Sequence, residues 1–249
     1  MVELPEVQLP LEAPLLQNLP GFPPLSNQTV CTVVSEPGLV TSRLSELNPS
    51  LTEGLLREVS EHGYRARIEA TDLHAPTAAG SYHWHAAVYA IRSMLAEQGW
   101  KPEVSRNCPF IVSPDRTIAI VVMTGDSDTG YVDGYPTNQA EKGAVLKQAI
   151  ANNQTQLKLF DAGSVSSKLA NSKDATQLWV LLYHVAVGSS GKVEIRIELS
   201  LPSHFEKKKI IGWRERIILN SILPDGESMI HDDAPTSPID VPVERRTGT

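Results

Sequence analysis

The chain has 249 residues, of which 41% are hydrophobic and 20% are charged, and its formal net charge is −7. This length suits one large domain or two small ones, and these proportions are ordinary for a globular protein. The negative balance argues against a generally basic nucleic-acid-binding surface, because phosphate binding needs concentrated lysine and arginine.

Three sequence features bear on the location of the protein. No apolar run approaches the length needed to cross a bilayer, and residues 1–6 carry no basic region before an apolar one. A membrane anchor and a secretory signal are therefore not expected. Cys31 and Cys108 lie far apart and no CxxC is present, which indicates two free thiols. Together these features predict a cytoplasmic protein.

The N-terminal part of the chain combines a proline-rich segment with a first strand and a first helix. Residues 1–27 contain six prolines, which block helix interiors and predict an extended arm. Residues 29–34 are rich in β-branched side chains and predict a strand. Ser50 and Glu53 have the spacing of a capping box, so we expect a helix to begin there and to end near Gly63.

The middle of the chain mixes helices with a hairpin. Apolar residues recur at helical spacing after Ser81, and Gly99 is suited to ending that helix. Residues 109–112 and 117–123 predict two strands of a hairpin. Residues 140–151 predict a third helix.

The last part of the chain predicts strands followed by a tail. Residues 178–187 and 193–201 flank a hairpin-length turn, and residues 210–219 predict a further strand. Residues 225–249 lose apolar periodicity and predict a disordered tail. The order of elements predicts a single α+β domain over residues 28–224, with a mostly antiparallel sheet and about three helices packed on it.

Two pairs of side chains are candidate ligands for a divalent metal. His83 and His85 lie close in sequence, but an i, i+2 pair is splayed on a helix. Asp126 and Asp128 follow a predicted buried strand, where carboxylates bind cations but a Gly- and Asp-rich loop equally suits turn geometry. A metal-dependent hydrolase or nuclease using these two regions is the alternative function. No P-loop, dinucleotide fingerprint or hydrolase nucleophile signature indicates another cofactor or reaction.

Two sets of charged residues in the last part of the chain are expected at the protein surface. Glu194, Arg196 and Glu198 alternate along a predicted strand, which indicates a solvent-facing side. One concentration of basic residues provides a local patch for nucleic acid, or a solvated loop and strand face: Lys207, Lys208, Lys209, Arg214 and Arg216.

The most specific feature is the pentapeptide Gln-Leu-Lys-Leu-Phe at residues 156–160. It resembles the QLxLF peptide by which bacterial DNA polymerases and repair proteins bind the sliding clamp. The resemblance implies that Gln156 enters a small polar pocket of the clamp with Leu157 beside it. It also implies that Leu159 and Phe160 fill the hydrophobic pocket.

The same apolar residues have an ordinary packing interpretation. Burial of Leu157, Leu159 and Phe160 in the domain core would make the pentapeptide a helix-end contact, whereas exposure would call for a partner. The segment is expected to follow the end of the helix predicted at residues 140–151 and to precede a small polar loop.

The leading hypothesis is a non-enzymatic bacterial accessory protein of DNA metabolism or mobile-element biology that binds the sliding clamp. The chain loosely resembles uncharacterised bacterial proteins through the Thr-Gly-Asp sequence after a strand and the segment Gly212–Arg216, and this resemblance implies no activity. A third hypothesis is a structural or regulatory domain that self-associates through the proline-rich arm or the tail.

Overall fold

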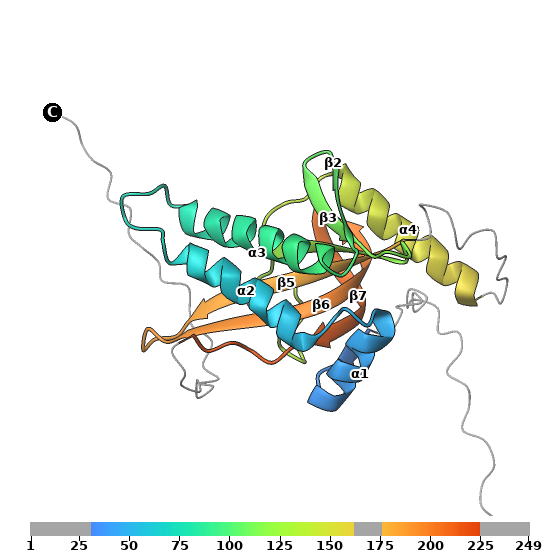
Figure 1. The fold of residues 1–249 in the computed structure, drawn as a ribbon, viewed down its shortest axis with the longest axis horizontal. Coiled ribbons are helices and arrows are strands. Elements are labelled where there is room, and N and C mark those ends of the chain that lie inside the picture. The colour runs from blue at the N-terminus through green and yellow to red at the C-terminus, as the bar shows by residue number, and fades with distance from the viewer. Residues whose placement is uncertain (1–30, 162–175, 225–249) are drawn as a thin grey trace, which may run out of the picture. The chain divides into compact units, whose positions relative to one another are not determined.

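The computed structural model describes residues 31–161 and 176–224, with the backbone alone for residues 154–161 (Figure 1). The described residues belong to a compact unit that begins at Cys31. The predicted arm over residues 1–27 and the predicted tail over residues 225–249 lie outside the described residues.

Within the described ranges, seven strands form one mixed sheet in the order β1-β7-β6-β5-β4-β3-β2. The pairs β1–β7 and β4–β5 are parallel, and the other neighbours are antiparallel. The α+β class is confirmed, but the sheet is mixed because β4 and β5 are joined by a crossover helix. The strands are β1 Thr32–Val34, β2 Lys101–Ser105, β3 Cys108–Val112, β4 Ile118–Thr124, β5 Gln177–Val187, β6 Val193–Glu206 and β7 Lys209–Ile218.

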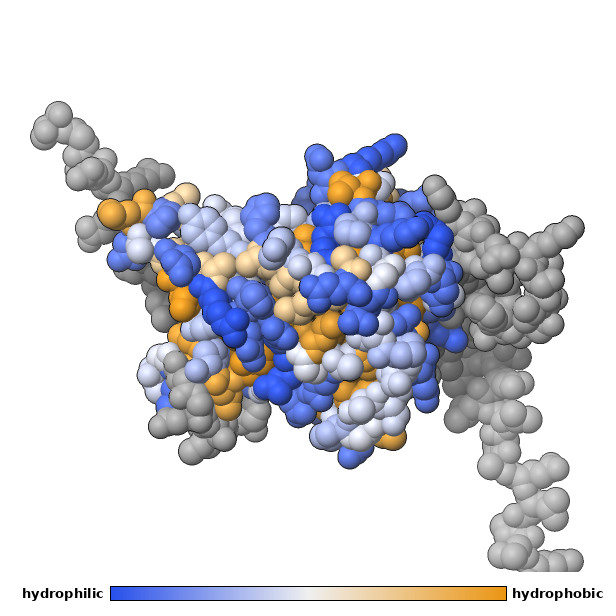
Figure 2. All heavy atoms as spheres, in the orientation of Figure 1, coloured by the Kyte–Doolittle hydropathy of each residue, from blue (hydrophilic) through white to orange (hydrophobic). Residues whose placement is uncertain are grey.

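Four helices are described where about three were expected. Figure 1 shows α2 and α3 side by side over one face of the sheet, and the crossover helix α4 on the other side. Figure 2 shows hydrophilic residues along the outer side of α2, as expected for a helix with one buried stripe. The helices are α1 Pro37–Leu47, α2 Glu53–Arg67, α3 Ala78–Ala96 and α4 Ala144–Asp161.

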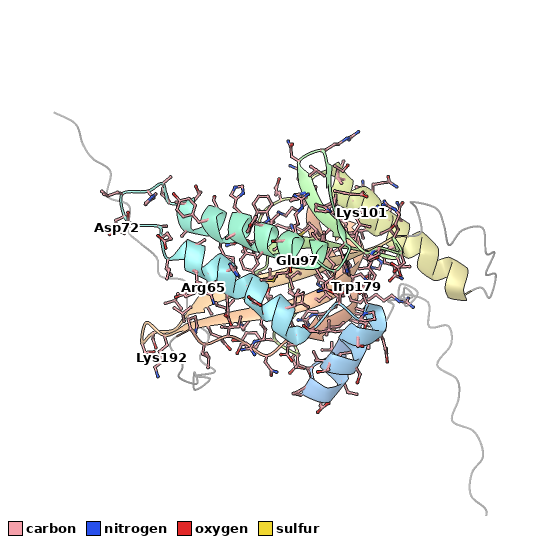
Figure 3. All side chains as sticks on the ribbon, viewed as in Figure 1. Arg65, Asp72, Glu97, Lys101, Trp179 and Lys192 are labelled. Carbon is pink, nitrogen blue, oxygen red and sulfur yellow. The ribbon has the colours of Figure 1, made fainter. Side chains whose placement is uncertain are left out.

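The sheet separates two hydrophobic cores, because successive strand residues point to opposite faces. Trp179 and Tyr183 of β5 belong to the larger core with α1, α2 and α3. Val180 and Leu182 belong to the smaller core with Leu146 and Ile150 of α4. The side chain of Trp179 lies beneath the helical layer (Figure 3), and both faces of β5 are therefore covered.

Several predicted boundaries were wrong for local reasons. Thr52, not Ser50, caps α2, since its hydroxyl accepts a hydrogen bond from the Leu55 amide at 3.1 Å. Helix α2 also continues past Gly63 to Arg67. Helix α3 was expected, and the chain leaves it through Gly99 with a φ of 85°, a conformation that favours glycine.

The end of α2 and two connections lie at one end of the described unit. Figure 3 shows Arg65 at the end of α2, Asp72 in the α2–α3 loop and Lys192 in the β5–β6 turn at this end. The carboxyl ends of the parallel strands β4 and β5 point the same way, and that edge of a sheet is where functional residues often lie in α/β folds.

Among residues 31–161 and 176–224, none of the helices has the length and apolar character needed to span a bilayer.

Candidate functional site

The clamp-like pentapeptide lies within helix α4 rather than after it. The helix was expected to end at residue 151, but its backbone is helical to Asp161 and includes residues 156–160. The side chains of residues 154–161 lie outside the described part of the chain. The exposure of Leu159 and Phe160, which decides between the clamp-binding and the packing interpretation, therefore lies outside the described part of the chain.

The helix is fixed to the sheet just before the pentapeptide. The amide nitrogen of the Asn153 side chain donates to the Leu178 carbonyl at 3.0 Å and to the Pro202 carbonyl at 3.4 Å. Its side-chain oxygen accepts from the Leu178 amide at 2.9 Å. A buried amide with these partners is satisfied, so it anchors α4 where the sequence indicates a polar helix end. Leu157 follows Asn153 by four residues and Phe160 follows Leu157 by three, the same alternation that links Leu146, Ile150 and Asn153.

The histidine pair is separated by helix α3, as the spacing predicts. His83 is fully buried and stacks on the Tyr183 ring with 3.9 Å between ring centroids, whereas His85 is exposed. Neither ring nitrogen of His83 has a hydrogen-bond partner among the described residues. Burial, with a smaller contribution from the Arg67 guanidinium, lowers the pKa of His83 to about 3. The buried ring is therefore neutral at ordinary pH.

This buried histidine predicts a distinct loss of stability in acid. The unfolded chain binds a proton below about pH 6.5, whereas folded His83 excludes it down to its lowered pKa. The contribution of neutral His83 to the free energy of unfolding is therefore fully present above pH 6.5 and is lost as the pH falls. We expect the free energy of unfolding to decrease by about 2–3 kcal/mol between pH 7 and pH 4.5 for this reason. Urea unfolding of the wild type and His83→Phe at both pH values measures this. We expect the phenylalanine variant, which retains a stacked ring, to lose that much less stability; equal losses would contradict the assignment.

Asp126 and Asp128 are engaged by the backbone of their own loop, residues 125–138. A carboxylate oxygen of Asp126 accepts from the Asp128 amide at 3.3 Å, and Asp128 accepts from the Tyr135 amide at 3.0 Å. In the part of the chain that the structure describes, no three histidine, cysteine or carboxylate side chains gather as a metal site. Among the described residues, His83, His85, Asp126 and Asp128 do not form such a group.

The same loop covers a layer of buried charge on β6 and β7. Glu194, Arg196 and Glu198 were expected on a solvent-facing side, but all three are buried. The Glu198 carboxylate accepts from Arg216 at 2.5 and 3.1 Å, and the Gly130 amide donates to it at 3.0 Å. This corrects the surface interpretation, which failed because the covering loop comes from a distant part of the chain.

Two arginines of the same layer also hold the loop. Arg216 donates to the Gly134 carbonyl at 2.7 Å and to the Tyr131 carbonyl at 3.0 Å. The Arg196 guanidinium lies 3.9 Å from the centre of the Tyr131 ring, a cation–π contact. These bonds give the loop a fixed position over the sheet.

The predicted basic patch is reduced by these contacts. Arg216 is 2% exposed and lies in the ion pair with Glu198. Lys208 pairs with Glu141 at 2.6 Å, and Lys209 donates to the carbonyls of Asn138 and Gln139. The pKa of Lys208 is raised, chiefly by its hydrogen bond to Glu141. Of these five residues, Arg216 is therefore buried in an ion pair, and Lys208 is paired with an acidic side chain.

A cavity of about 270 Å³ lies beside the second half of β4, between the start of β3 and the start of α4. Its walls include two basic side chains, a thiol and an indole, none of which was grouped by sequence reasoning: Arg106, Lys142, Cys108 and Trp84. Burial raises the pKa of the Cys108 thiol and lowers the pKa of Lys142. The one sequence signal that could have indicated this cavity was Pro109, because proline interrupts the pairing of neighbouring strands.

Comparisons with known proteins do not extend these findings. No protein-family model matches the chain, and neither the curated proteins nor the solved structures contain a match. The geometry and the sequence are therefore the basis for the function.

Proposed function

We propose that this chain is a non-enzymatic bacterial accessory protein of DNA metabolism or mobile-element biology, acting in the cytoplasm. We infer that it binds the DNA polymerase sliding clamp through residues 156–160. The observation that carries this proposal is the sequence Gln-Leu-Lys-Leu-Phe, in which glutamine and three apolar residues take the positions of the QLxLF peptide. A short segment with apolar anchors docks into a preformed groove at low ordering cost.

The position of the pentapeptide in α4 is compatible with this function. The anchor at Asn153 lies three residues before Gln156, so the helix is secured to the sheet upstream of the proposed peptide. Helix ends open locally at far lower free energy than the whole domain. We infer that the last turns of α4 unwind to present residues 156–160 as an extended peptide, while Leu146 and Ile150 stay packed.

Binding of purified clamp by surface plasmon resonance tests the proposal. We expect the double variant Leu159→Ala/Phe160→Ala to bind at least about tenfold more weakly than the wild type, since buried anchors dominate such interfaces. Lys158→Ala, at the variable position, is the matched control and is expected to bind within about twofold of the wild type. Equal binding by the wild type and the double variant would contradict the proposal.

A helix-weakening variant tests the unwinding step. Gln154 lies in α4 between the Asn153 anchor and the pentapeptide, and glycine there disfavours the helix by up to about 1 kcal/mol. If unwinding precedes docking, Gln154→Gly is expected to bind the clamp up to about fivefold more tightly. Weaker binding by this variant would show that the helical form itself is the ligand.

A further inference from the structure

The cavity beside α4 arises because strands β3 and β4 separate. Their pairing is Ile111 with Ile120 and Val112 with Ala119. The same register would place Pro109 opposite Val122 and Cys108 opposite Met123, but these residues are not paired. Cys108 and Pro109 instead line one wall of the cavity, and Val121, Val122 and Met123 line another.

Proline explains where the two strands part. The Ser113 amide donates to the Ile118 carbonyl at 2.8 Å, so alternate residues of β3, including position 109, direct their amides toward β4. Pro109 has no N–H to donate there. The Val122 carbonyl accepts instead from the indole nitrogen of Trp84 at 3.1 Å. The indole thus gives the Val122 carbonyl the hydrogen bond that β3 does not provide, and the space between the two strands stays open.

The cavity has a positive side. Lys142 and Arg106 both line it, and neither side chain has an ion pair within the ranges that the structure describes. The acidic wall residue, Glu141, is neutralised by Lys208 at 2.6 Å, and the first turn of α4 carries no acidic residue. In a chain of net charge −7, this is a local concentration of uncompensated positive charge.

The remaining walls are apolar. The flat indole of Trp84 and the side chains of Val121 and Met123 contribute to them. Small-molecule sites combine such apolar lining with a few convergent polar groups. The thiol of Cys108 lies close enough to Lys142 that each shifts the pKa of the other.

We propose that this cavity binds a small organic anion, a carboxylate carried on an apolar body, with Lys142 and Arg106 facing the carboxylate and Trp84 against the apolar part. This inference is independent of clamp binding, because the cavity is at the start of α4 and the pentapeptide is at its end.

Alkylation of the two free cysteines tests the proposal with the full-length protein. Iodoacetate carries a carboxylate and iodoacetamide is its neutral analogue; each forms a thioether with the thiol and releases iodide and a proton. Cys31 is the internal control, since burial raises its pKa as it does for Cys108, but Glu198 and Glu215 lie near it together with Arg216. Mass spectrometry of the two cysteine peptides gives both rates at each site.

We expect the iodoacetate-to-iodoacetamide rate ratio to be about fivefold higher at Cys108 than at Cys31, an effect of the size that nearby cations exert in a partly solvated site. Lys142→Gln is expected to abolish this preference without changing the ratio at Cys31. Benzoate is expected to protect Cys108 from iodoacetamide at concentrations where benzamide does not.

Two outcomes would overturn the proposal. One is an equal rate ratio at both cysteines of the wild type. The other is equal protection of Cys108 by benzoate and benzamide. If Lys142→Gln does not fold, Arg106→Gln in the exposed β2–β3 turn replaces it, and an unchanged preference in that variant also contradicts the assignment.

Discussion

Replacing Glu198 with glutamine is expected to lower the free energy of unfolding by about 3–5 kcal/mol. The carboxylate is fully buried and faces Arg216, which is itself only 2% exposed. Removing one partner of a buried ion pair leaves the other charge without compensation, and that is the source of the large effect. The loop over residues 125–138 is expected to loosen as well, since the Gly130 amide donates to the same carboxylate.

A surface ion pair provides the matched control. Glu61→Gln makes the same chemical change in an exposed pair with Arg65, where about 0–1 kcal/mol is expected. Urea unfolding of both variants, with Arg216→Met and the double variant to complete a mutant cycle, measures the coupling. A loss below about 1 kcal/mol for Glu198→Gln would contradict the buried-pair interpretation.

Glycine-to-alanine substitutions in α2 and α3 are expected to have opposite signs. A Cβ atom at Gly63 would collide with the ring of His83, so Gly63→Ala is expected to cost about 1–3 kcal/mol through overpacking. Gly80 is also helical, and a Cβ atom added there would have nothing within 4 Å. Gly80→Ala is therefore expected to stabilise the protein by about 0.5–1 kcal/mol.

The melting temperatures of the two variants decide this prediction. The same methyl group is added in both, so intrinsic helix propensity favours both changes and only the packing differs. A stabilised Gly63→Ala variant would mean that α2 and α3 can separate without loss, and that His83 is not confined between Gly63 and Tyr183.

Elements with a strong local pattern could be predicted from the sequence. The buried run of β4, the β5–β6 hairpin and the stripe of α3 were all found, because their periodicity is set within each segment. Helix α1 was missed: it begins at Pro37-Gly38, and its buried face consists of Val40 and Leu44 alone. Arg43 of this helix forms a bidentate contact with Glu215 of β7, a partner far away in the sequence.

Features that depend on distant segments could not be predicted from local patterns. The polar run at residues 152–155 predicts a helix end, but Asn153 is satisfied by β5 and β6, so the helix continues. Glu198 and Arg216 look like surface charges until the loop at residues 125–138 covers them. The parallel pairing of β4 with β5 also needs the crossover through α4, which no short-range signal specifies.

The indole of Trp84 has a consequence for the edges of the sheet. Exposed strand edges are templates for pairing with another chain, and natural sheets keep such edges short or covered. β1 and β2, at the ends of the described sheet, have three and five residues. The longer strand β4 would offer a third edge where β3 departs. There a side chain from α3 occupies the Val122 carbonyl, so the gap in the sheet is open to a small molecule but closed to an incoming strand.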